Sequence, residues 1–113
     1  MNGISWKKNI IKINNEEMPL MADVIEAREI KGIVLVVTTP EDKVLDNLFG
    51  ISIETGDIWR VQKLHEVYPG FSQTPYVGVS IKDNEVLVTD FCGCRFVVDL
   101  MDGKILKQAR ETR

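Results

Sequence analysis

The chain has 113 residues and a mass of 12.8 kDa, enough for one domain and too little for two of ordinary size. Its hydrophobic content of 44% excludes a disordered chain, and its charged fraction of 27% is ordinary for a globular protein. The net charge of -3 argues against binding a phosphate backbone and leaves room for a basic partner. We therefore expect one folded domain over residues 1–113.

The N-terminal segment alternates lysines with isoleucines and lacks the apolar stretch of a signal peptide. No apolar run approaches the roughly 18 residues of a membrane-spanning helix, so we expect a cytoplasmic protein. Residues 9–13 predict one additional strand. Residues 18–21 predict a loop, because Pro19 removes an amide from any strand ladder.

The remainder of the chain contains two copies of one module. Placing Asn47 over Cys94 aligns Phe49 with Phe96, Gly56 with Gly103 and Ile58 with Ile105. The first unit spans residues 24–62, the second spans 76–109, and a linker over residues 63–75 joins them. Such a repeat predicts that both units share one arrangement of strands and turns.

Each unit predicts a four-stranded antiparallel meander, because short β-branched or aromatic runs alternate with turn residues. Gly56 and Gly103 supply the positive φ that tight hairpins need, and Asp83 with Asn84 tolerates it. A single helical turn is expected within residues 42–48. The predicted strands cover residues 24–29, 33–38, 47–53, 58–62, 76–82, 86–91, 94–100 and 104–109.

Two meanders without covering helices can bury their apolar faces only against one another, which predicts an all-β fold, a β-sandwich of propeller-blade-like repeats. Two adjacent propeller blades are the alternative. Trp59 is expected to cap one end of the core. The predicted core positions are Ile25, Ala27, Val34, Val36, Phe49, Ile51, Ile53, Val77, Val79, Ile81, Val86, Val88, Phe96 and Val98.

Residues suited to catalysis are sparse. His65 is the sole histidine and falls in the linker, where a solvated side chain is expected. Cys92 and Cys94 flank a single glycine, so a disulfide between them would be strained, and two thiols without nearby histidines do not form a zinc site. We expect reduced thiols, no enzyme activity, no metal and no cofactor. A small hydrolase using His65 and a cysteine is kept as a third hypothesis.

Surface recognition is the function that these residues favour. Aromatic side chains in loops and at strand ends are interleaved with aspartates, a combination by which protein surfaces bind basic proteins. Packing at the ends of the sandwich is the alternative role for the aromatics. From charge and aromaticity, the residues expected to bind a partner are Asp42, Asp46, Tyr68, Tyr76, Asp90 and Phe91.

The order of four motifs resembles a known family. The motifs are the hairpin Asn47-Leu48-Phe49-Gly50-Ile51-Ser52-Ile53-Glu54-Thr55-Gly56-Asp57-Ile58-Trp59, the strand Pro75-Tyr76-Val77-Gly78, the corner Thr89-Asp90-Phe91-Cys92-Gly93 and the hairpin Asp102-Gly103-Lys104-Ile105. Over residues 24–108 they resemble bacterial immunity proteins of contact-dependent growth inhibition and other polymorphic toxin systems, built from half-propeller or PQQ-like repeats. The short corner at 91–93 and the long connection at 39–46 depart from a plain pair of blades.

The resemblance implies a non-enzymatic inhibitor that binds one cognate toxin domain, often a nuclease, and blocks its active site or substrate groove. It transfers no binding residue, because contact surfaces diverge with the toxins. The alternative function is a propeller-like module for protein interaction or ligand binding, without a toxin partner. The sequence leaves the oligomeric state open.

Overall fold

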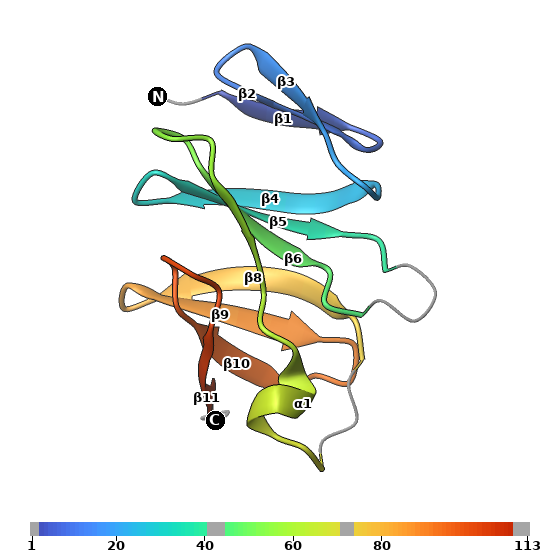
Figure 1. The fold of residues 1–113 in the computed structure, drawn as a ribbon, viewed down its shortest axis with the longest axis vertical. Coiled ribbons are helices and arrows are strands. Elements are labelled where there is room, and N and C mark those ends of the chain that lie inside the picture. Colours follow the sequence, from blue (N-terminus) through green and yellow to red (C-terminus); the bar gives the residue numbers. More distant parts are fainter. Residues whose placement is uncertain (1–2, 41–44, 71–73, 110–113) are drawn as a thin grey trace.

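The computed structural model describes residues 3–40, 45–70 and 74–109, which form three antiparallel sheets and one short helix (Figure 1). The N-terminal sheet contains β1 (Ile4–Lys7), β2 (Ile10–Ile13) and β3 (Glu16–Pro19). The middle sheet contains β4 (Val24–Ile30), β5 (Ile33–Thr38), β6 (Leu48–Ser52) and β7 (Ile58–Arg60). The C-terminal sheet contains β8 (Tyr76–Lys82), β9 (Glu85–Asp90), β10 (Arg95–Val98) and β11 (Ile105–Ala109).

The two predicted four-stranded meanders are confirmed as the middle and C-terminal sheets, and both follow chain order. The predicted strand at residues 9–13 is confirmed as β2, but it belongs to a third sheet that the sequence did not predict. The loop predicted at residues 18–21 is wrong for its first two residues. Pro19 ends β3, an edge strand, where a missing amide breaks no internal ladder.

The middle sheet lies between the other two (Figure 1), so its central strand β5 is buried on both faces. Val34 and Val36 join the apolar cluster shared with the N-terminal sheet. Leu35 and Val37 join the cluster shared with the C-terminal sheet. The predicted alternation assigned only one face of β5 to the core. A strand covered on both sides carries a continuous apolar run instead.

Three other core assignments are wrong, because Ile25, Val77 and Ile81 are 45%, 46% and 38% exposed. All three lie on β4 or β8, the first strand of each four-stranded sheet and an edge of it. An edge strand has a neighbour on one side only, so its side chains are less completely covered than those of inner strands.

Helical structure is found at another place than predicted. The segment Leu64–Val67, expected to be loop, forms the short helix α1, whose Leu64 is buried in the core. The helical turn expected at residues 42–48 lies partly outside the described residues, and Leu45 to Asn47 are not helical. In the part of the chain that the structure describes, helical segments fall short of the length and hydrophobicity of a membrane span.

Trp59 is half-buried and packs against the larger core cluster. Its indole Nε1 donates to the carbonyl of Leu100 at 2.9 Å, which ties β7 to the C-terminal sheet. A Cβ atom on Gly50 would lie 2.1 Å from the indole, and one on Gly103 would lie 2.4 Å from it. The ring therefore occupies space that two glycines leave open.

Candidate interaction surface

Three of the residues predicted to bind a partner lie inside the molecule. Asp46, Tyr76 and Asp90 are 7%, 1% and 2% exposed. Asp42 lies outside the described residues. The structure thus brings the three buried side chains together at the junction of the middle and C-terminal sheets. The contacts that the structure gives for these three side chains are all made to other residues of the same chain.

Asn47, for which the sequence analysis predicted no role in the site, holds this junction. Its side-chain Nδ2 donates to the carbonyl of Thr38 at 2.5 Å and to the carbonyl of Tyr76 at 2.8 Å. Its Oδ1 accepts the amide of Tyr76 at 2.7 Å. Asn47 is buried, so it satisfies backbone groups at the end of β5 and the start of β8 that water cannot reach.

Tyr76 is enclosed beside this asparagine. Burial, with the Asp90 and Asp46 carboxylates adding to it, raises the pKa of the Tyr76 phenol to about 12. Among the described residues its hydroxyl has no hydrogen-bond partner. The phenol therefore stays neutral and acts as a core side chain.

Asp46 is held by Arg60 of β7. The Arg60 Nε lies 3.2 Å from the Asp46 carboxylate and donates to the Asp46 carbonyl at 3.0 Å. The guanidinium also stacks over the Phe49 ring, 5.0 Å from its centroid. This aspartate thus anchors the segment that leads into β6.

Asp90 organises the turn between β9 and β10, here named the Phe91 corner (residues 90–94). Its buried Oδ1 accepts the amides of Cys92 at 3.0 Å and Cys94 at 2.8 Å. The Asp90 amide donates to the carbonyl of Cys94, and the amide of Gly93 donates back to the carbonyl of Asp90. Gly93 has a φ of 88°, which a residue without a side chain adopts at little cost.

Phe91 projects from this corner and is 75% exposed. Its amide donates to the carbonyl of Pro75 at 2.8 Å, so the start of β8 also supports its backbone. Tyr68, by contrast, is half-buried, with its ring centroid 6.1 Å from that of Phe96. Of the predicted partner-binding residues that the structure describes, Phe91 is the one fully presented to solvent.

Matching irregularities occur near the start of β4 and β8. The strand register shifts between Val24 and Glu26 in β4 and between Tyr76 and Gly78 in β8. The inserted residues, Ile25 and Val77, are the exposed apolar positions noted above. Bulges at sheet edges redirect side chains. Val77 is thereby exposed two residues after Pro75, beside the Phe91 corner.

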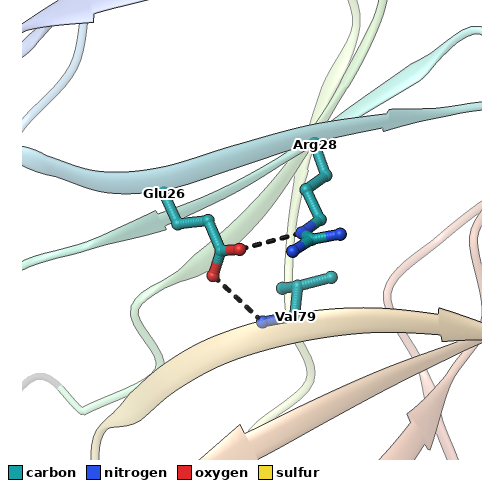
Figure 2. Close-up of polar contacts among 3 residues, drawn as sticks. All are labelled: Glu26, Arg28 and Val79. Atoms are coloured by element: carbon teal, nitrogen blue, oxygen red, sulfur yellow. Dashed lines mark hydrogen bonds and ion pairs between the residues drawn. The ribbon is translucent and has the colours of Figure 1, made fainter.

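The edge of β8 is closed to strand pairing at its centre (Figure 2). Glu26 of β4 accepts the Val79 amide with Oε1 at 3.4 Å and the Arg28 Nε with Oε2 at 2.8 Å. A carboxylate that occupies an edge amide discourages a partner strand from pairing there. A partner that approaches the start of β8 would therefore contact side chains such as Phe91 and Val77 instead of adding a strand to the sheet.

The thiol and histidine hypothesis gains no support from the geometry. Burial, with Asp90 and Cys92 adding to it, raises the pKa of the Cys94 thiol, which disfavours the thiolate nucleophile. Tyr68, Arg95 and Lys107 are among the residues that line the crevice beside Cys94, and His65 is not. Within the described ranges, no three metal-ligating side chains gather.

Comparison with known proteins places the chain in a family. Residues 1–110 match the family described as "Domain of unknown function (DUF7957)", and the chain belongs to that family. No curated protein and no solved structure matches it.

Proposed function

We propose that this member of a domain family of unknown function binds another protein through the Phe91 corner. More specifically, following the resemblance in its repeats, we propose an immunity protein that neutralises a toxin domain. The single observation that carries the proposal is the presentation of Phe91, an aromatic side chain that is 75% exposed on a turn fixed by hydrogen bonds.

A fixed exposed aromatic residue is well suited to anchor an interface. Covering an exposed phenylalanine side chain contributes about 1.5–3 kcal/mol. Because Asp90 and Pro75 already hold the turn, little backbone freedom is lost on binding. Val77, 46% exposed near the same corner, extends the apolar area.

The charge of the molecule indicates the kind of partner. A net charge of -3 accelerates encounter with a basic protein, and nuclease toxins act on an anionic substrate, for which a basic surface is suited. The inhibitor would then work by covering the active site or substrate groove and would need no reaction of its own.

Co-expression with the toxin domain encoded by the neighbouring gene tests this proposal, together with calorimetry on the purified pair. We expect the wild-type protein to protect cells, and we expect Phe91→Ala to weaken binding by about 2 kcal/mol or more, roughly 30-fold in Kd. Met101→Ala is the matched control, since Met101 is 76% exposed on a different turn. Cell death despite the wild-type protein, or equal losses in both variants, would overturn the proposal.

A module that joins a larger β assembly is the second candidate from the repeats. The N-terminal sheet speaks against it, because its outer face carries the exposed charged residues Lys7, Lys12 and Glu17 and only one large exposed apolar side chain, Ile10, among the described residues. An additional blade would require an apolar surface there. Light scattering that finds a monomer would weaken this candidate further.

A further inference from the structure

A small crevice opens between the N-terminal and middle sheets, at the end of the molecule opposite the Phe91 corner. It lies beside the β2–β3 and β6–β7 turns, on the left in Figure 1, whereas the β9–β10 turn is on the right. Its volume is about 130 Å³. Its apolar walls are Ile13, Met18, Ile51 and Ile53, and its polar lining residues are Asn14, Glu16, Glu17 and Ser52.

Glu16 lies on the same face of the N-terminal sheet as two isoleucines. Glu16 pairs across the ladder with Ile13, which pairs with Ile4. Residues directly opposite each other in an antiparallel sheet share a face. Both isoleucines pack toward the middle sheet, so Glu16 lies on that inner face too, and it lines the crevice. Glu17, next in the chain, pairs with Lys12 in the ladder and also lines the crevice, so two carboxylates border it.

Glu16 is exposed, and among the described residues it has no ion-pair partner. An apolar wall with a free carboxylate matches the shape of a basic side chain, whose methylene stem prefers apolar surface while its head needs an anion. An acidic side chain in the crevice would be repelled by the Glu16 and Glu17 carboxylates, and a neutral one would gain no ion pair with them.

We propose that this crevice is a second recognition site, which takes an arginine or lysine side chain from a basic protein partner. Arginine fits best, because its planar fork can bind the Glu16 carboxylate through two hydrogen bonds. The proposal goes beyond the function assigned to the Phe91 corner and does not depend on it, since the two places lie at opposite ends of the sheets.

Amide NMR titrations with Nα-acetyl-arginine N-methylamide test the site directly, and Nα-acetyl-citrulline N-methylamide is the neutral probe of matched shape. We expect saturable shifts at Glu16, Met18 and Ile53 with the arginine probe, and binding about tenfold weaker or more with citrulline. Glu16→Gln should lose the preference for the cationic probe. Glu66→Gln, the matched control at an exposed glutamate of α1 that does not line the crevice, should keep it.

Equal shifts with both probes, or equal effects of the two variants, would overturn the proposal. So would a Glu16→Gln protein that self-associates while binding the arginine probe normally, because the carboxylate would then protect the β3 edge instead. No toxin is used in this experiment, so a negative result would not count against binding at the Phe91 corner.

Discussion

Replacing Asn47 with alanine tests the junction that joins the middle and C-terminal sheets. The change removes the three hydrogen bonds that the side chain makes to the backbones of Thr38 and Tyr76. Each contributes about 1 kcal/mol net. The amide and carbonyl of Tyr76 would also lose these buried partners, so we expect the free energy of unfolding to fall by about 3 kcal/mol, a large share of a small domain's stability.

Urea unfolding measures this loss. An unchanged slope of the free energy of unfolding against urea concentration would indicate that the variant and the wild-type protein expose the same surface on unfolding. Asn9→Ala is the matched control, because Asn9 is half-buried and makes one comparable bond, from Nδ2 to the carbonyl of Leu20 at 3.0 Å. Its expected cost is about 1 kcal/mol. If Asn47→Ala cost no more than Asn9→Ala, the reasoning about the junction would be refuted.

Two further predictions concern the core. Gly50→Ala should cost about 2 kcal/mol or more in urea unfolding, because its Cβ would lie 2.1 Å from the Trp59 indole, whereas Gly3→Ala, with nothing within 4 Å, should be near neutral. Tyr76→Phe should lessen the loss of stability in alkali. Because the folded pKa of Tyr76, about 12, exceeds the ordinary value of 10.0, the contribution of the neutral phenol to stability is complete below pH 10 and is lost as pH rises through 12. Urea unfolding of both proteins at about pH 9 and about pH 11 measures this loss, and an equal loss in the wild-type protein and in Tyr76→Phe would contradict the assignment.

Strands and turns of the two repeats could be predicted from the sequence because their causes are local. Asp83 and Asn84 were expected to tolerate positive φ, and they have φ values of 51° and 64°. Gly56 and Gly103, aligned by the repeat, have φ values of 79° and 78°. In each case, residues adjacent in the chain determine the turn.

The candidate site was predicted less completely. Phe91 is exposed as expected, and its aspartate neighbour fixes the corner from within. The burial of Tyr76 agrees with the packing role given above as the alternative for the aromatics, whereas its hydrogen bond to Asn47, 29 residues away in the chain, could not be inferred. An asparagine that begins a predicted strand carried a weak signal of such a role, since a buried amide must find several partners.

The amino-acid sequence alone thus determined that the chain is all-β, where most strands of the two repeats lie, and which turns join them. Only the tertiary structure decided that β5 is covered on both faces, that Ile25 and Val77 are turned outward, and that Glu16 faces a crevice. The physical reason is that a period of two residues separates the two faces of a strand. Which face is covered depends on a neighbouring sheet, and distant parts of the chain supply that sheet.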